Sequence, residues 1–288
     1  MLPTISFAGR QVSRLIIGGN PFSGNSHVSS QMDEEMMNYF TVENIKKALF
    51  NCMKNGINTV QARGDRHITR ILREFRQEGG DMHWIAQTAS ETVSGGLNEI
   101  MKYGPIAIYH HGTVTDSLYK EKKYDKIQRN LRAIRETGKW TGLGTHMPEV
   151  VEYAEAEGWD IDFYMTSIYN LSRTDRVSSA VTGKANEDEV FDDGDRALMY
   201  EAIRKTEKPC LVFKILGATR RCGTPDSVKS AFEEAFINIK PIDAIVVGMY
   251  PNATDQITEN AFITSEILKN TNYSKSKACS KNDCYKLW

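Results

Sequence analysis

Long apolar segments are absent from this sequence of 288 residues. No stretch approaches the roughly eighteen uninterrupted apolar residues that a transmembrane helix needs. The first residues, MLPTISFAGRQ, contain none of the apolar core that marks a secretory signal peptide. We therefore expect a protein that neither enters a membrane nor is secreted, and that resides in the cytoplasm.

Cysteine and excess charge of one sign are also scarce. The five cysteines, at positions 52, 210, 222, 279 and 284, are an odd number without the spacing of a disulfide framework, so we expect reduced thiols. A formal net charge of −1 provides neither the basic field that attracts nucleic acid nor a polybasic membrane anchor. The partner we expect is a small-molecule substrate. Composition leaves the oligomeric state open.

What the sequence does contain is a regular alternation. Short apolar, β-branched runs alternate with longer segments of helical period, which is the pattern of βα units that build a parallel sheet. The predicted strands are Arg14–Gly18, Asn58–Ala62, His83–Thr88, Ile106–Tyr109, Thr141–Thr145, Phe163–Ser167, Cys210–Ile215 and Ala244–Val247. The predicted helices are Val42–Asn55, Ile68–Gln77, Leu97–Lys102, Asp125–Glu136, Glu149–Glu157, Ala197–Lys205, Asp226–Ile237 and Asp255–Leu268. Eight such units predict an α/β fold, a (β/α)8 TIM barrel in which residues 1–288 form one domain.

Local signals mark several element ends. Thr224 before Pro225 predicts a helix N-terminus, and Asn252 is a candidate cap for the last helix. Glycines that follow helical runs predict helix ends at positions 56, 79, 138 and 158. Two loops are long, residues 20–40 and 171–195, and both follow strands, on the side where barrel active sites are built. Residues 270–288 form a tail rich in lysine and serine.

Polar side chains gather at the predicted carboxyl ends of the strands. Four of the six histidines belong to this set, and scattered wall histidines would have no reason to choose one end of the barrel. The set comprises His27, Gln61, Arg63, Asp65, Gln87, His110, His111, His146, Tyr169, Asn170 and Lys214. Lys214 interrupts the apolar run CLVFKILG, so it is either an amine with a depressed pKa or an anion ligand, or else half of an ion pair that closes the barrel top.

Six segments, in the correct order, resemble the aldo/keto reductase superfamily, and in particular its bacterial branch with a C-terminal iron–sulfur module. ISFAGRQVSRLIIGGN resembles the family's N-terminal β-hairpin and first barrel strand, and GINTVQARGD resembles the second-strand segment. AIYHHG is similar to the segment that ends in the active-site histidine. The later segments are GKWTGLGTHMPEVVEYAEAEGWDIDFYMTSIYNLSR, KPCLVFKILGATR and VVGMYPNATDQITENA, the last similar to the phosphate loop and following helix.

The catalytic tetrad that this resemblance implies is mostly replaced. His110, or His111 with a one-residue slip, takes the histidine position. The aspartate position holds Gln61, or Val60 with another gap, and the lysine position holds Gln87 or Thr88. The segment ARGDRHIT contains no tyrosine, so the usual proton donor is missing. The candidate catalytic residues are therefore His110, His111, Lys214, Arg63 and Gln61.

The positions that match the family's cofactor-binding residues are better preserved, and the resemblance at these positions implies NAD or NADP as the cofactor. Glu259 and Asn260 match the pair that meets the adenine, while Tyr169 and Asn170 match positions that support the nicotinamide. Gly248 and the turn from Met249 to Thr254, including Asn252, resemble a phosphate cradle at a helix N-terminus. Gln256 replaces the arginine that would meet a 2′-phosphate, which argues against a strong NADP preference. Only Cys279 and Cys284 lie in the tail, so we expect no iron–sulfur cluster.

Three hypotheses remain open. The first is a divergent oxidoreductase of aldo/keto reductase type that acts on a small carbonyl or sugar-like substrate, with His110 or His111 and Lys214 as its acid groups. The second is a metal-dependent lyase, isomerase or hydrolase in which His27, His110 and His146, with Asp65 or His111 as a further ligand, hold a divalent ion such as zinc. The third is a reductase-like binding protein without catalysis.

Overall fold

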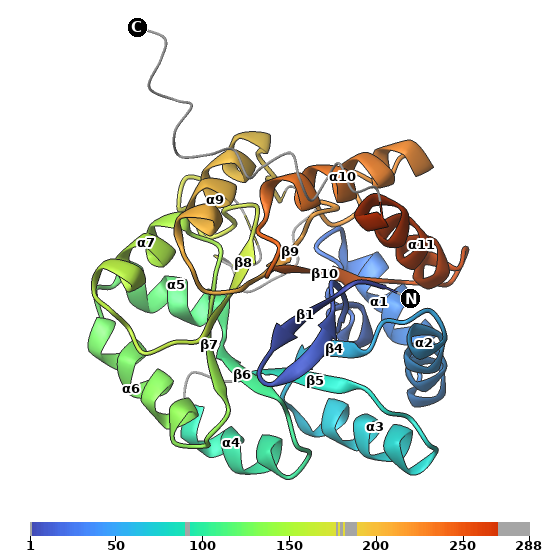
Figure 1. Cartoon of the computed structure of the whole chain (residues 1–288), viewed down its shortest axis with the longest axis horizontal. Coiled ribbons are helices and arrows are strands. Elements are labelled where there is room, and N and C mark those ends of the chain that lie inside the picture. Colours follow the sequence, from blue (N-terminus) through green and yellow to red (C-terminus); the bar gives the residue numbers. More distant parts are fainter. Residues whose placement is uncertain (1, 90–92, 177, 179–180, 182–188, 270–288) are drawn as a thin grey trace, which may run out of the picture.

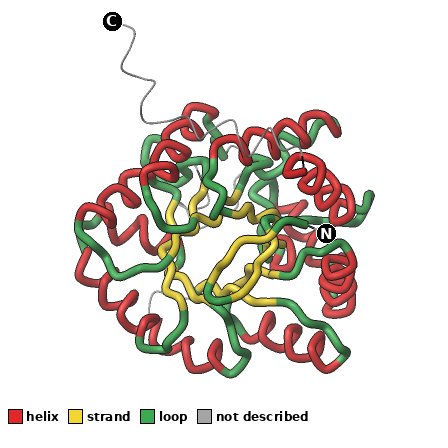
Figure 2. Tube along the Cα trace, in the orientation of Figure 1, coloured by secondary structure: helices red, strands yellow, loops and turns green. Residues whose placement is uncertain are grey.

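Eight parallel strands close into a barrel in the order β10-β3-β4-β5-β6-β7-β8-β9 (Figures 1 and 2). The structure is a computed structural model, and it describes residues 2–89, 93–176, 178, 181 and 189–269. The barrel strands are β3 Leu15–Gly18, β4 Thr59–Arg63, β5 His83–Gln87, β6 Ala107–His110, β7 Trp140–Thr145, β8 Phe163–Ser167, β9 Cys210–Phe213 and β10 Ala244–Gly248. The predicted (β/α)8 TIM barrel is therefore confirmed, and each strand lies within two residues of its predicted ends.

Helices surround the barrel on its outer side (Figure 2). They are α1 Ser30–Tyr39, α2 Val42–Lys54, α3 Arg66–Gln77, α4 Val93–Met101, α5 Gly112–Lys120, α6 Tyr124–Arg135, α7 Pro148–Ala156, α9 Asp193–Lys205, α10 Pro225–Asn238 and α11 Gln256–Lys269. Thr224 caps α10 in a capping box with Pro225 in its first turn, as predicted. Among the described residues, no helix is long and apolar enough to cross a membrane.

A hairpin closes one end of the barrel. Strands β1 (Thr4–Phe7) and β2 (Arg10–Ser13) pair antiparallel, and their apolar side chains belong to one buried cluster with the barrel interior. The ring of Phe7 lies 4.9 Å from that of Trp140 and 5.0 Å from that of Phe163, the residues that begin β7 and β8. Because the hairpin seals the amino-terminal ends of the strands, the end that it leaves uncovered, called the mouth here, lies at their carboxyl ends.

Side chains alternate between the barrel interior and the helix layer along each strand. In β6, Tyr109 belongs to the interior cluster, whereas Ile108 belongs to the cluster shared with the helices. The same alternation directs His110 outward and His111 inward. Gly142 of β7 also faces inward, where a Cβ would lie 2.3 Å from the ring of Phe163, so only glycine leaves room for that ring.

Several local predictions differ from the structure. The loop of residues 20–40 contains a 3₁₀ turn, Pro21–Ser23, and helix α1, while α5 lies in a stretch for which we predicted no helix. Asp255, and not Asn252, caps the last helix, since its Oδ1 accepts a hydrogen bond from the Thr258 amide at 3.2 Å. Of the loop 171–195, residues 177, 179–180 and 182–188 lie outside the described residues, as do the tail 270–288 and its Cys279 and Cys284.

Candidate active site

His110 does not reach the mouth. Its side chain is fully buried, with Nδ1 2.7 Å from Thr115 Oγ1 on α5 and Nε2 3.0 Å from Asn130 Nδ2 on α6. Because the Thr115 hydroxyl donates to the carbonyl of His111 at 3.1 Å, His110 Nδ1–H donates to Thr115, and its Nε2 accepts from the Asn130 amide. Burial lowers the pKa of His110 to about 4. The prediction that His110 lies in the mouth is therefore wrong. Its neutral ring instead connects strand β6 to helices α5 and α6.

His111 is the histidine that enters the mouth from β6. Its Nδ1 is buried and has no hydrogen-bond partner among the described residues. Burial, followed by the charges of His146 and Arg63, lowers the pKa of His111 to about 4, which places all three side chains in one neighbourhood. A buried polar atom without a partner is costly in a folded protein unless something else binds it. His111 Nδ1 is therefore a candidate contact for a ligand.

Asp116 on α5 holds His146, the residue that follows β7. Its Oδ2 accepts hydrogen bonds from His146 Nδ1 at 2.8 Å and from the His146 amide at 3.0 Å. Thr145 Oγ1 and Ser172 Oγ donate to the same carboxylate at 2.5 and 2.6 Å. These donors satisfy a side chain that is only 1% exposed, and they fix the His146 tautomer with its proton on Nδ1. Within the described part of the chain, Nε2 of His146 has no hydrogen-bond partner, so it can act as a base.

Lys214, His27 and Glu189 form a second chain of contacts. Lys214 Nζ lies 2.8 Å from His27 Nε2, and His27 Nδ1 lies 3.1 Å from Glu189 Oε2. Burial, followed by the charge of Lys214, lowers the pKa of His27 to about 4, so the ring is neutral and accepts a hydrogen bond from the amine. Burial likewise lowers the pKa of Lys214 to about 8, although Glu189 opposes the shift. Within the described ranges, Lys214 therefore contacts a neutral ring and forms no direct salt bridge.

Phe213 lies close to a member of each group. Its ring centroid is 5.7 Å from the His146 ring and 5.7 Å from Lys214 Nζ. His146 is also close enough to His27 to lower the pKa of that residue. An aromatic side chain at the carboxyl end of β9 therefore lies near both a base and a primary amine.

Arg220 connects the loops that carry this second group. Its guanidinium donates to the backbone carbonyls of His27 and Glu189, each at 3.1 Å, and its Cζ lies 4.1 Å from the centroid of the Phe191 ring. Loops that follow three different strands, β3, β8 and β9, thereby meet at one side of the mouth.

The tetrad positions on β4 and β5 form a neutral network. Gln61 Nε2 donates to Tyr109 Oη at 2.8 Å, and Gln87 hydrogen-bonds to the same hydroxyl. Burial raises the pKa of Tyr109 above its ordinary range, so the hydroxyl keeps its proton. Gln61 therefore supports Tyr109 inside the barrel.

Arg63 is half exposed at the rim, where its Nη2 donates to the Ala89 carbonyl at 3.0 Å and its Nε lies 3.7 Å from Asp65 Oδ2.

The three histidines of the metal hypothesis are not assembled as ligands. His110 points to the helices, while His27 contacts Lys214 and Glu189, and Asp116 engages His146. Among the described residues, no three His, Cys, Asp or Glu side chains are grouped so that they could hold a metal ion. Asp65 is used as the N-cap of α3, where it accepts from the Ile68 amide. The donor set therefore does not fit a zinc site.

The predicted phosphate cradle is occupied by contacts of the chain itself. Asp255 places a carboxylate at the first amides of α11, where a phosphate would otherwise bind and where it now repels one. Gln256 Oε1 accepts from the Tyr250 amide at 2.8 Å, and Tyr39 Oη donates to the Pro251 carbonyl at 2.9 Å. Asn252 Nδ2 donates to Tyr250 Oη at 3.1 Å.

The other predicted cofactor residues are similarly engaged. Tyr169 is 1% exposed, beneath Phe191 at 5.0 Å between ring centroids, and Arg196 donates to its hydroxyl. The amide of Asn170 donates to Asp195 Oδ2 at 3.0 Å. Met249 and Asn260 are buried, whereas Gly248 and Glu259 are exposed. These residues, as arranged here, do not fit a nicotinamide stacked on Tyr169 with its phosphates on α11.

Sequence reasoning missed Asp116, Glu189, Tyr109 and Arg220. Glu189 lies in the loop 171–195 that we singled out, but nothing in the sequence chooses it among the acidic residues there. Tyr109 could have been found from the period of two that it shares with His111.

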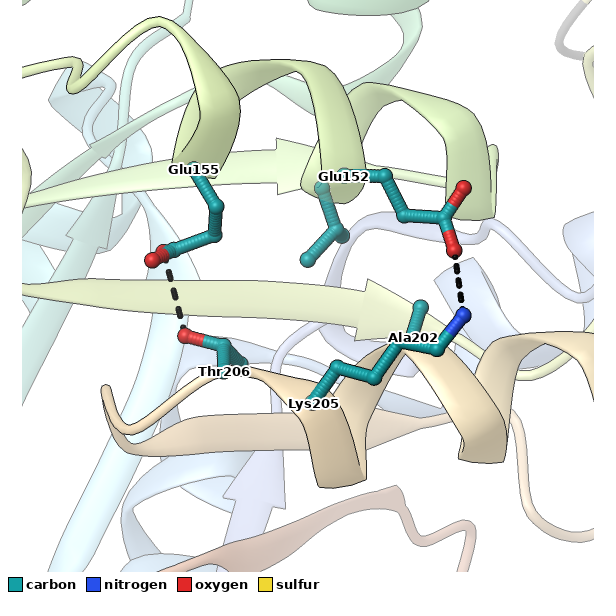
Figure 3. A pocket seen from close by; sticks show the side chains of 6 residues that line it. Glu152, Glu155, Ala202, Lys205 and Thr206 are labelled. Atoms are coloured by element: carbon teal, nitrogen blue, oxygen red, sulfur yellow. Dashed lines mark hydrogen bonds and ion pairs between the residues drawn. The ribbon is translucent and has the colours of Figure 1, made fainter.

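A separate groove of ≈ 310 Å³ lies between α7 and α9 on the outer wall (Figure 3). Its polar groups contact one another: Lys205 Nζ lies 3.0 Å from Glu152 Oε1, and Thr206 Oγ1 donates to Glu155 Oε1 at 3.0 Å. Because these groups already have partners and lie far from the strand ends that position His146 and Lys214, the groove is not the candidate active site.

Comparison with known proteins identifies the fold. No protein-family model matches the chain, and no curated protein matches it. A truncated 3-deoxy-D-arabino-heptulosonate 7-phosphate synthase from Thermotoga maritima is similar, with a TM-score of 0.55 and 15% identity over 94% of this chain and 92% of that one. An aldo-keto reductase from Bacillus halodurans gives 0.56 and 10% over 93% and 96%. Dihydropteroate synthase from Yersinia pestis gives 0.53 and 11% over 96% and 100%. At these identities the likeness shows the TIM-barrel fold and no particular activity.

Proposed function

We propose that the chain is an enzyme that transfers a proton at the carbon next to a carbonyl group of a small polar substrate bound in the mouth of the barrel. The observation that carries this proposal is the Asp116–His146 pair, in which the buried carboxylate fixes the ring at 2.8 Å and leaves Nε2 available to the mouth. A histidine held in one tautomer by a carboxylate is a typical general base.

Lys214 supplies the complementary charge. An enolate develops negative charge on its oxygen when the neighbouring carbon loses a proton, and a cation at that oxygen stabilises the transition state. A substrate that lies on Phe213 is near both the His146 ring and Lys214 Nζ, each 5.7 Å from the ring centroid. His111 Nδ1, buried without a partner among the described residues, is available to a further polar group of the substrate. Isomerisation, epimerisation and aldol-type reactions share this step.

Nicotinamide-dependent reduction, the first hypothesis from the sequence, has less support than proton transfer. The resemblance to aldo/keto reductases motivates it: Gln61 and Gln87 lie on the adjacent strands β4 and β5, and His111 directly follows the next strand, β6. However, the Asp255 carboxylate at α11 and the burial of Tyr169 do not favour a bound dinucleotide. Proton transfer requires only groups that this chain supplies.

The proposal is tested by hydrogen–deuterium exchange in D2O. Pyruvate, 2-oxobutyrate and dihydroxyacetone are incubated with the protein, and loss of the α-proton signal is followed by NMR. We expect exchange above the buffer rate with at least one compound, and a decrease of about 10²- to 10⁴-fold in His146→Gln. His67→Gln, an exposed histidine on α3, is the control. Exchange at the same rate in His146→Gln as in the wild-type protein would overturn the proposal.

A further inference from the structure

The geometry around Lys214 points to a covalent role. We propose that Nζ of Lys214 forms an imine with an aldehyde or ketone carbonyl of the substrate, with His27 as the group that orients the amine and accepts its proton. This inference rests on the proposed function and deepens it, since a protonated imine withdraws electrons from the neighbouring carbon more strongly than a carbonyl beside an ammonium group.

The first support is the direction of the hydrogen bonds. Glu189, whose side chain is 0% exposed, faces His27 Nδ1 at 3.1 Å, so the ring proton lies on Nδ1. His27 Nε2 then carries a lone pair, and it accepts a hydrogen bond from Lys214 Nζ at 2.8 Å. When the amine is neutral, this bond uses one N–H and leaves the nitrogen lone pair free to attack. Nucleophilic catalysis ordinarily uses a nucleophile, a base beside it and a third group that orients the base. Here these groups are Lys214, His27 and the Glu189 carboxylate.

The second support is the state of the amine. Burial lowers the pKa of Lys214 to about 8, so about one molecule in ten carries the neutral amine at pH 7. An ordinary lysine would have a neutral fraction roughly three hundred times smaller. The residue as a whole is nevertheless partly exposed.

The third support is the backbone. Lys214 and His27 both have positive φ angles, 65° and 59°, although neither is glycine. Such conformations are strained for a residue that carries a Cβ, and they concentrate at functional sites. Among the six described non-glycine residues with positive φ, these two are joined by a side-chain contact. Arg220 stabilises the arrangement by binding the carbonyl of His27.

The reaction balances without any further reactant. The Nζ lone pair forms the C–N bond while the carbonyl π pair moves to oxygen, and one amine proton reaches that oxygen by way of His27 Nε2 to give the carbinolamine. The C–O bond then breaks, and the second amine proton joins the departing oxygen. The products are one water and a neutral imine, in which the former carbonyl carbon is doubly bonded to Nζ of Lys214. This imine becomes the active iminium on binding one proton. The reaction involves no oxidation or reduction.

Borohydride trapping tests the proposal on the full-length protein. The protein is incubated with pyruvate or dihydroxyacetone, reduced with sodium borohydride and analysed by peptide mass spectrometry. We expect a stable secondary amine on Lys214, and no adduct at that position in Lys214→Arg. Lys240→Arg is the matched control, since Lys240 is also largely buried, but is paired with Asp243 at 3.1 Å at the end of the barrel opposite the mouth. His27→Gln should slow adduct formation at least roughly tenfold while Lys214 remains.

The outcomes separate the two proposals. Deuterium exchange together with an adduct on Lys214 supports both. Exchange in the absence of an adduct, or with adducts spread over surface lysines, overturns the imine and leaves the proposed proton transfer intact. If neither exchange nor adduct occurs with any probe, both are overturned. Peptide mapping of the wild-type protein gives this answer even if a variant fails to fold.

Discussion

The Asp116 carboxylate of α5 accepts a hydrogen bond from Nδ1 of His146, 2.8 Å away at the end of β7. Thirty residues separate the pair, and the donors Thr145 and Ser172 hold the carboxylate in turn. A helix that begins directly after β6 therefore determines which nitrogen of the next strand's histidine faces the mouth. The catalytic consequences of this arrangement can be measured.

Replacing Asp116 by asparagine should reduce the rate of α-proton exchange. The amide cannot accept from all four donors, and it no longer favours the His146 tautomer with its proton on Nδ1. We expect α-proton exchange to fall by about 10²- to 10³-fold, measured by NMR in D2O. Ser172→Ala removes one donor and keeps the carboxylate, so it serves as the control. Equal exchange rates in Asp116→Asn and the wild-type protein would contradict this role.

Stability should decline with acid before most carboxylates titrate. His27, His110 and His111 have folded pKa values lowered to about 4, against about 6.5 in an unfolded chain. Between these values the unfolded state binds more protons, so the free energy of unfolding falls as the pH falls. Each histidine contributes up to about 1.4 kcal/mol per pH unit. Urea titrations from pH 7 to pH 5 measure this slope, and a flat profile would contradict the buried neutral rings.

The hairpin should be needed for stability. Phe7 is fully buried and contacts Trp140 and Phe163 at the sealed end of the barrel. Phe7→Ala should lower the free energy of unfolding by about 3–5 kcal/mol. Phe262→Ala is the matched control, because that ring is 65% exposed on α11, and it should cost less than about 0.5 kcal/mol. Similar losses for the two variants would show that the hairpin does not seal the barrel.

Nicotinamide nucleotides should bind weakly. The Asp255 carboxylate occupies the N-terminus of α11 and the side-chain amide of Gln256 binds the loop itself, so a pyrophosphate would meet a negative charge. Fluorescence titration with NADH and NADPH is expected to show no saturation up to millimolar concentration. Saturable binding below that range would restore hydride transfer as the leading function.

The sequence was sufficient to predict the barrel but not the arrangement of its mouth. Hydrophobic periodicity and helix-capping residues identified all eight barrel strands. Each βα unit has its own apolar pattern and its own signals for helix ends, such as Thr224–Pro225. The segment AIYHH shows where this information ends. Both faces of a parallel strand are buried, so Ile108 and Tyr109 are both apolar, and the pattern does not reveal which histidine faces inward.

Contacts between distant segments could not be predicted either. His27 and Lys214 are 187 residues apart, and only barrel closure brings their strands' loops together. The position of Asp116 could not be predicted because its helix, α5, has a sequence that does not indicate a helix. The segment GTVTDSLYK begins with glycine, contains two β-branched threonines and a valine, and is short. Without α5, its carboxylate had no predicted position.

The most direct test of the whole account is the exchange rate of the double variant His146→Gln, Lys214→Met beside its two single variants. If the two side chains act on one bound carbonyl, each single variant should lose about 10²- to 10⁴-fold. The double variant should then lose little more than the slower single variant, because residues that act as a unit are not additive. Exchange at the wild-type rate in either single variant, or a double-variant loss equal to the product of the single losses, would contradict a shared site.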